Sequence, residues 1–327
     1  MRGTIGLCEG IVSDARERDR RRRRVAALRC GGLLLAGLLL TVWVLNAGRP
    51  GSRAAGCAAG CSTALQRADG PLRIMSLNVL HDFPRFHHLS RRLDLIAAEI
   101  RRQDADIVCL QEVPWTLRLG SAAGYLAGRT GLNYLYLRAN GNRWAILFEE
   151  GEAILSRFPL RDPAVVELRP APGLFEHRVA LHATAVTPWG DLRVFATHLT
   201  TGDPGLNQGQ AAALQSFVAA TGSGPAVVAG DFNAAEDSPQ IQALADVWID
   251  TYRTANPGSP GLTCCIDDLA AQSADLTERI DYLFLVPDGQ ARVASSQKVL
   301  DKPVWVGDGW QWASDHVGLL TAIFLNP

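Results

Sequence analysis

Residues 73–113 read RIMSLNVLHDFPRFHHLSRRLDLIAAEIRRQDADIVCLQEV and hold two short apolar runs with a helical pattern between them. The runs RIMSLNVL (73–80) and DIVCLQEV (106–113) have the length and apolar content of buried strands. Between them the apolar spacing predicts a helix over residues 89–102, because apolar side chains three and four residues apart share one helix face. That face carries Leu93, Ile96, Ala97 and Ile100.

The same alternation continues to the end of the chain. A further helix is expected over residues 205–220. Further strands are expected over residues 153–157, 179–186, 192–199, 226–232, 279–286, 291–300 and 316–324. Strands and helices mixed in one compact unit predict an α/β sandwich, in which sheets are covered by helices.

The N-terminus differs in composition from the rest. Residues 1–29 are rich in arginine, with five consecutive arginines at 20–24, and residues 30–47 hold 18 residues without a charge. This pattern predicts a transmembrane signal anchor whose arginine-rich end stays in the cytoplasm. The competing interpretation is a cleaved signal peptide, which would release a secreted protein. Residues 48–70 have the composition of a linker, which leaves 71–327 as an extracytoplasmic domain.

Charge divides the chain in the same place. Residues 1–47 carry nine arginines against four acidic residues, and the remainder carries 23 basic against 29 acidic residues, a balance of −6. Proteins that grip nucleic acid through many phosphates usually have a basic face. An acidic domain therefore disfavours nucleic acid as a partner without excluding it.

The chain holds seven cysteines, of which Cys109 lies in the apolar run IVCL and is expected to be a buried thiol. Cys57, Cys61, Cys264 and Cys265 are candidates for disulfides in an oxidising compartment. Because a vicinal pair is strained, we expect Cys264 or Cys265 to bridge elsewhere. The alternative is that these cysteines bind zinc, but no histidine has the spacing of a zinc finger around them.

Polar residues stand where the apolar strands begin or end. They are Asn78, Glu112, His198, Asp231, Asn233, Asp281, Asp315 and His316. Sheets hold side chains rigidly at strand ends, and active sites gather there. Carboxylates, carboxamides and imidazoles without an essential cysteine suit Mg²⁺ or Mn²⁺ as the cofactor.

In order, the motifs LNV, LQEV, GEAILSR, THLT, GDFNA, RIDYLF and SDH resemble those of the endonuclease/exonuclease/phosphatase superfamily, from about residue 73 to 325. Each motif alone is weak, and a lone GDFN or SDH is more often a turn or a capped strand end. The resemblance implies a four-layer α/β sandwich of two mixed, largely antiparallel sheets flanked by helices. It also implies a metal-dependent hydrolase of phosphodiesters or phosphomonoesters.

The resemblance assigns the metal to Glu112, with Asn78 beside it and Asp315 near the ion or its water shell. Asp231 would orient or deprotonate the attacking water. The bland alternative for Asn78 is a residue that satisfies backbone groups at a strand end. An unpaired carboxylate after a buried strand would be costly, which favours a cation beside Glu112.

The same resemblance lets Asn233 hold the water or a phosphate oxygen, and lets Asp281 orient His316 against the phosphate. His198 would donate to a phosphate oxygen or assist the leaving group. Glu152 stands where relatives often have asparagine, and a carboxylate there could orient His198.

Arg178 is a further candidate for phosphate binding. The bland alternative for His198 is a satisfied core histidine. A carboxylate inside an apolar strand, as at Asp281, has no such simple explanation.

Three classes of phosphate-ester substrate stay open: nucleic acid, a phospholipid or sphingolipid head group, and an inositol phosphate. The anchor would bring the membrane within reach, but no long apolar hairpin is evident, and VWVGDGWQW (304–312) is the nearest candidate. Its tryptophans could stack on bases, lie at a bilayer surface or pack in the core. A catalytically inactive binding module is the non-enzyme alternative, and we expect a monomer.

Overall fold

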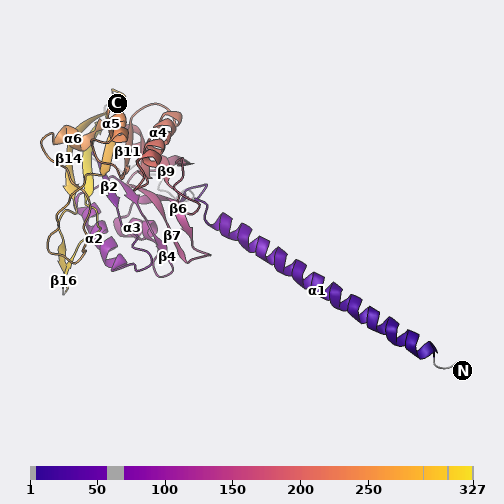
Figure 1. Cartoon of the computed structure of the whole chain (residues 1–327). Coiled ribbons are helices and arrows are strands. Elements are labelled where there is room, and N and C mark those ends of the chain that lie inside the picture. The colour runs from indigo at the N-terminus through magenta and orange to yellow at the C-terminus, as the bar shows by residue number, and fades with distance from the viewer. Residues whose placement is uncertain (1–4, 57–69, 290, 308, 326–327) are drawn as a thin grey trace. The chain divides into compact units, whose positions relative to one another are not determined.

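The computed structural model describes residues 5–56, 70–289, 291–307 and 309–325 (Figure 1). The chain divides into two units, residues 1–47 and 48–327. The first unit holds one long helix, α1 (Ile5–Ala47). Its segment Arg20–Val44 is long and apolar enough to cross a membrane.

The second unit contains two sheets and a small hairpin. The first sheet consists of β1 (Ala55–Gly56), β2 (Leu72–Asn78), β3 (Ile107–Gln111), β4 (Trp115–Thr116), β5 (Gly120–Ser121), β6 (Asn133–Asn142), β7 (Phe148–Ser156), β14 (Ala291–Val299) and β17 (Gly318–Leu325). Its order is β1-β6-β7-β3-β2-β17-β14, with β4 pairing β5 and β7. β2 and β3 are parallel, and the other pairs described in this sheet are antiparallel.

The second sheet has the order β12-β13-β11-β10-β9-β8. Its strands are β8 (Leu160–Glu167), β9 (Val179–Thr187), β10 (Gly190–His198), β11 (Ala226–Asp231), β12 (Ile249–Asp250) and β13 (Asp281–Val286). β10 and β11 are parallel, and the other pairs are antiparallel. The hairpin is formed by β15 (Val304–Val306) and β16 (Gly309–Gln311).

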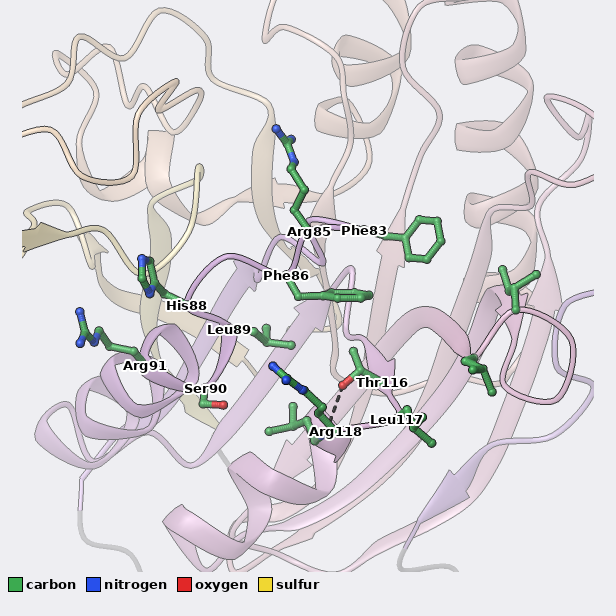
Figure 2. A pocket seen from close by; sticks show the side chains of 13 residues that line it. Phe83, Arg85, Phe86, His88, Leu89, Ser90, Arg91, Thr116, Leu117 and Arg118 are labelled. Atoms are coloured by element: carbon green, nitrogen blue, oxygen red, sulfur yellow. Dashed lines mark hydrogen bonds between the residues drawn. The ribbon is translucent and has the colours of Figure 1, made fainter.

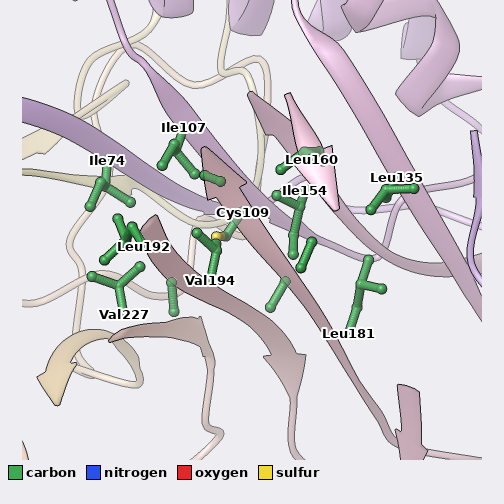
Figure 3. Packing of buried hydrophobic residues seen from close by; sticks show 14 of the residues in the cluster. Ile74, Ile107, Cys109, Leu135, Ile154, Leu160, Leu181, Leu192, Val194 and Val227 are labelled. Carbon is green, nitrogen blue, oxygen red and sulfur yellow. The ribbon is translucent and has the colours of Figure 1, made fainter. Parts of the chain in front are cut away.

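Helices cover the outer faces of both sheets. They are α2 (Leu89–Arg102), α3 (Ala122–Thr130), α4 (Pro204–Ala220), α5 (Pro239–Ala245) and the short α6 (Thr251–Ala255). Side chains of α2 and α3 pack in one apolar cluster with the first sheet, and those of α4 and α5 pack with the second. A third cluster joins the inner faces of the two sheets (Figure 3). The four-layer α/β sandwich is therefore confirmed.

Alternation along β3 shows how the sequence builds these layers. Ile107 and Cys109 lie in the cluster between the sheets, whereas Val108 and Leu110 lie in the cluster under α2 and α3. Successive strand side chains point to opposite faces, so an uninterrupted apolar run suits a strand covered on both sides. Cys109 is fully buried, as the sequence predicts.

Most predicted elements are confirmed within a few residues, and α2 has the predicted bounds. The sequence analysis missed β6 and β8. β8 carries Arg161, Asp162 and Pro163 inside its span, which interrupt the apolar pattern of a strand.

Residues 48–56 of the expected linker are part of the second unit. β1 pairs with β6, and Gly51 N–H donates to Arg138 O at 2.8 Å. Residues 57–69, with Cys57 and Cys61, are outside the described residues. The expectation that Cys264 or Cys265 bridges elsewhere is wrong, because the two cysteines form a disulfide with each other. Their proximity in one loop makes this pairing available without any other chain segment.

His182 makes the fold sensitive to acid. It lies on β9 with 3% of its surface exposed, and its ring is 4.6 Å from that of Phe195. Its ring nitrogens have no hydrogen-bond partner among the described residues. Burial, with a smaller effect of the Arg193 charge, lowers the pKa of His182 from 6.5 to about 4.

Between these two pKa values the unfolded chain binds a proton that the folded chain does not, so stability falls as the pH falls. We expect His182 to cost up to about 3 kcal/mol of unfolding free energy between pH 7 and pH 4. Replacing it by phenylalanine (His182→Phe) should remove that share of the acid sensitivity. Urea unfolding at both pH values, compared between the two proteins, measures it. Equal losses in wild type and variant would contradict the assignment.

Candidate active site

The strand pairings bring the polar strand ends to one place. His198 at the end of β10 stands beside Asp231 at the end of β11, and Asp231 stands beside Asp281 at the start of β13. Asn78 ends β2 in the facing sheet, and its Nδ2 donates to Asp231 Oδ2 at 3.1 Å. This hydrogen bond joins the two sheets at the site.

Asp231 is the centre of this group, with 1% of its surface exposed. Its Oδ1 accepts a hydrogen bond from Asn233 N at 2.9 Å. Burial and the neighbouring charge of Asp281 raise the pKa of Asp231 to about 7, although His316 opposes the shift. A carboxylate of that pKa can accept a proton near neutral pH.

His316 is held between two carboxylates. Its Nδ1 lies 2.8 Å from Asp281 Oδ2, and its Nε2 lies 3.7 Å from Asp231 Oδ2. These carboxylates raise the pKa of His316 well above its usual value, against the effect of burial. The two carboxylates thus favour the protonated imidazole, and Asp281 holds the ring through Nδ1.

His198 has a different environment. Its Nδ1 lies 3.0 Å from Arg178 Nη1, and its Nε2 lies 2.9 Å from Asn233 Nδ2 and 3.4 Å from Asp231 Oδ2. Burial and the Arg178 charge lower the pKa of His198 well below 6.5. Arg178 Nη1 and Asn233 Nδ2 are both donors and a neutral imidazole has one acceptor nitrogen, so only one of these two contacts is a hydrogen bond to the ring.

The expectation that Glu152 orients His198 is wrong, because Arg178 occupies the Nδ1 side. Glu152 lies on β7, is 1% exposed, and its Oε2 has no hydrogen-bond partner among the described residues. Burial first, and then the neighbouring Glu150, raise the pKa of Glu152 well above 4.5. Glu150 is also buried, with its own pKa raised by burial.

Glu112 lies directly after β3 with its backbone at φ +53°, a conformation that is uncommon for a residue other than glycine. Asn78 Nδ2 donates to Glu112 Oε1 at 3.1 Å, and His81 N–H donates to Oε2 at 3.2 Å. Asn78 thus presents its amide nitrogen to Glu112 and Asp231, while its Oδ1 accepts from Leu80 N at 3.0 Å.

Asp315 lies beside this group, three residues before the last strand, β17. Burial raises the pKa of Asp315, and the nearby charge of Glu112 adds to the shift while His316 opposes it. Its Oδ1 accepts from Ser314 Oγ at 3.2 Å. The site therefore gathers more buried carboxylates than cationic side chains, which is the composition that a hard divalent cation would balance.

Two geometric groupings of ligand atoms could hold an ion among the described residues. One is Asp231, Asp281 and His316, and the other is Cys264, Cys265 and His316. Neither coincides with the predicted set of Glu112, Asn78 and Asp315. In the first group Asp281 and His316 already pair through a 2.8 Å contact, and in the second the cysteines form a disulfide.

A model of the Endonuclease/Exonuclease/phosphatase family matches residues 75–316. The chain belongs to this family. Members of this family are phosphoester hydrolases, and the membership agrees with the order of the motifs from LNV to SDH. No protein of curated function matches the sequence significantly.

Solved structures confirm the fold of this family member. A family protein from Beutenbergia cavernae is 24% identical, with a TM-score of 0.58, and the match covers 78% of this chain and 72% of that one. A family protein from Bacteroides vulgatus is 22% identical, with a TM-score of 0.62 and coverages of 79% and 100%. A mannosyl-6-phosphatase from Bacteroides thetaiotaomicron is 17% identical, with a TM-score of 0.62 and coverages of 78% and 100%.

The sequence analysis missed Arg92, which fixes the loops around this site. Its side chain is fully buried and donates to the carbonyl oxygens of four residues. These are Val79 (2.7 Å), Leu80 (2.8 Å), His87 (3.2 Å) and Ala313 (3.2 Å). The available signal was its position on the apolar face of α2, four residues before Ile96.

Arg92→Lys tests this support. A lysine keeps the charge, but its ammonium cannot reproduce the planar fork that reaches four carbonyl oxygens. We expect the free energy of unfolding to fall by about 2 to 4 kcal/mol, since buried polar groups lose their partners. Chemical denaturation measures the change. The control is Arg91→Lys, because Arg91 is exposed; similar stability in the two variants would refute the role of Arg92.

Proposed function

We propose that this chain is a divalent-metal-dependent hydrolase that attacks phosphodiester or phosphomonoester bonds with water. The observation that carries the proposal is the meeting of Asn78 and Glu112 from one sheet with Asp231 from the other. The hydrogen bonds of Asn78 to both carboxylates, each 3.1 Å long, support it.

Asp231 is the residue that would accept the proton of the attacking water. Its pKa of about 7 lets it exist as a carboxylate at neutral pH and still take up a proton. Asn233, whose backbone holds Asp231 Oδ1, has its side-chain amide beside His198 and so would position the water or a phosphate oxygen.

Cationic and donor groups would stabilise the negative charge on the phosphate. The charged His316, held by Asp281, is one such group. Burial and the Arg178 charge lower the pKa of His198, so its neutral ring would donate to a phosphate oxygen or to the leaving oxygen through the nitrogen that carries its proton. Arg178, proposed from the sequence as a phosphate ligand, would act through His198, since its Nη1 lies against Nδ1 and its Nη2 binds Glu176.

Glu112 and Asp315 would hold a Mg²⁺ or Mn²⁺ ion, because both offer the carboxylate oxygens that such ions prefer. Asn78 would join them as a ligand only with its carboxamide turned over, since the oxygen is the atom that binds such ions. A bound ion would polarise the phosphate and stabilise charge on the leaving oxygen. The hydrogen bonds that Glu112 accepts from Asn78 and from the His81 backbone hold its carboxylate in place and support this assignment.

Several structural neighbours have named functions or bound anions. They include a mannosyl-6-phosphatase, a truncated Caenorhabditis elegans TDP2 and a human Nocturnin catalytic domain with a bound sulfate anion. The phosphatase and the bound sulfate among these neighbours support a phosphate ester as the substrate.

We propose that α1 anchors the catalytic domain to the cell membrane on its extracytoplasmic side, with secretion after cleavage as the alternative.

Hydrolysis of bis-p-nitrophenyl phosphate tests the proposed reaction. The full chain should release p-nitrophenol with Mg²⁺ or Mn²⁺, lose that activity with EDTA, and recover it when the ion is restored. Asp231→Asn should lower kcat by about 10² to 10⁴, the usual contribution of a general base. Turnover that is insensitive to EDTA would contradict the proposed metal dependence.

His316→Gln and an exposed control, Arg161→Gln, complete the set. Gln keeps hydrogen-bonding capacity at position 316 but removes the positive charge, so kcat should fall strongly with thermal stability checked in parallel. Arg161 lies on β8, outside the site, and its substitution should leave kcat unchanged. Folded Asp231→Asn and His316→Gln proteins with wild-type kcat would refute the assigned roles.

A further inference from the structure

A hollow with an apolar wall lies where residues 83–91 meet residues 116–119 and 146–147 (Figure 2). Its volume is about 640 Å³. We call it the apolar groove and define its wall by Phe83, Phe86, Leu89, Leu117, Ile146 and Leu147. Arg85, Arg91 and Arg118 also line it.

A chain of ring contacts connects the apolar groove to the proposed metal ligand. His81 Nε2 lies 3.6 Å from Glu112 Oε2, and the His81 ring lies 5.2 Å from that of Phe148. Phe148 stacks on Phe83 with ring centroids 4.3 Å apart, and Phe83 is part of the groove wall. Two side chains, His81 and Phe148, thus connect Glu112 to the wall of the apolar groove.

A neighbouring hollow of about 830 Å³ strengthens this connection. It shares Arg85, His88 and Arg91 with the apolar groove and extends to Asp315. The two hollows thus adjoin each other along residues 85–91, with Asp315 in the wall of one and the apolar side chains in the wall of the other.

The apolar side chains of the groove are unusually exposed. Leu117 is 68% exposed, Ile146 is 53% exposed and Leu147 is 52% exposed. Trp144, in the turn before Ile146, is 84% exposed. Contiguous exposed apolar residues mark a binding surface in soluble domains, because leaving them in water is unfavourable.

The local backbone holds this surface in place. Thr116 Oγ1 accepts a hydrogen bond from Leu119 N at 3.1 Å, which closes the turn that carries Leu117 and Arg118. Asn142 Oδ1 accepts from Trp144 N at 2.9 Å and so shapes the turn that carries Ile146.

We propose that the apolar groove binds a hydrocarbon chain of a membrane phospholipid whose phosphate ester enters the catalytic site. This inference rests on the proposed phosphoester hydrolysis and names its substrate class. Water would attack phosphorus, the bond from phosphorus to the lipid oxygen would break, and the lipid oxygen would take up a proton.

Charge and chemistry favour a lipid over the other occupants. The side of the groove formed by Leu89, Leu117, Ile146 and Leu147 is aliphatic, which suits acyl chains better than stacked bases. Arg91 and Arg118 are exposed and make no ion pair with the described residues, so they are available for the phosphates of an anionic bilayer. The candidate membrane span in α1 would keep lipid at high local concentration.

Photo-crosslinking of the full chain tests the proposal. The probe is phosphatidylglycerol with a diazirine in the middle of one acyl chain, presented in nonionic detergent micelles. After irradiation and digestion, mass spectrometry should find label on peptides that contain residues 83–91, 114–119 or 144–148, as well as on α1. Label on α1 serves as the internal reference, because that helix contacts lipid in any case.

Leu117→Asp and Leu147→Asp should each lower groove labelling at least fivefold relative to α1 labelling. Both side chains are exposed, so we expect the variants to fold, and melting temperatures check this. Leu174→Asp is the matched control, since Leu174 is 76% exposed outside the groove and should leave labelling and turnover unchanged.

Label confined to α1 would overturn the proposal, as would groove labelling that both aspartate variants leave unchanged. Loss of groove labelling in the presence of a single-stranded oligonucleotide, but not of unlabelled phosphatidylglycerol, would also overturn it in favour of bases. Turnover of bis-p-nitrophenyl phosphate by the wild type is measured separately. A protein that turns over this substrate but fails to label refutes the lipid groove alone.

Discussion

Two buried carboxylates facing each other across neighbouring strands, Asp231 and Asp281, set the main electrostatic constraint of this molecule. Neither can be ionised in an apolar interior without compensation. His316 supplies part of it, with Nδ1 on Asp281 and Nε2 toward Asp231. Burial, and after it the charge of Asp281, raises the pKa of Asp231 to about 7, which prepares this carboxylate to act as a base.

The layered fold allows this arrangement to persist. Apolar residues on both faces of the central strands fix the sheets, and the polar residues of the site lie at or next to the ends of those strands. Asn78 then joins the sheets through its hydrogen bonds to Glu112 and Asp231. The buried guanidinium of Arg92 donates to Val79 O, just after Asn78, and to Ala313 O, two residues before Asp315. The positions of Asn78 and Asp315 therefore both depend on this one side chain.

The sequence predicted the elements whose apolar pattern is regular, and the polar strand ends that it singled out lie close together in the fold. It could not predict contacts that depend on how loops approach each other. Glu152 was expected at His198, but Arg178 lies there, because the position along β7 does not reveal which side chain of a neighbouring strand reaches the imidazole. Exposed apolar turns such as Trp144–Leu147 were also missed, since a short apolar run in sequence looks the same whether it is buried or not.

The proposed hydrolysis depends on a cation that balances the surplus of carboxylates on the side of Glu112. Crystals of the protein soaked in Mn²⁺ and measured at the manganese absorption edge test this most directly. We predict an anomalous peak bound to the carboxylate of Glu112, with Asp315 in its coordination or water shell. A peak held instead by Asp281 and His316, or by Cys264 and Cys265, with none at Glu112, would contradict the account.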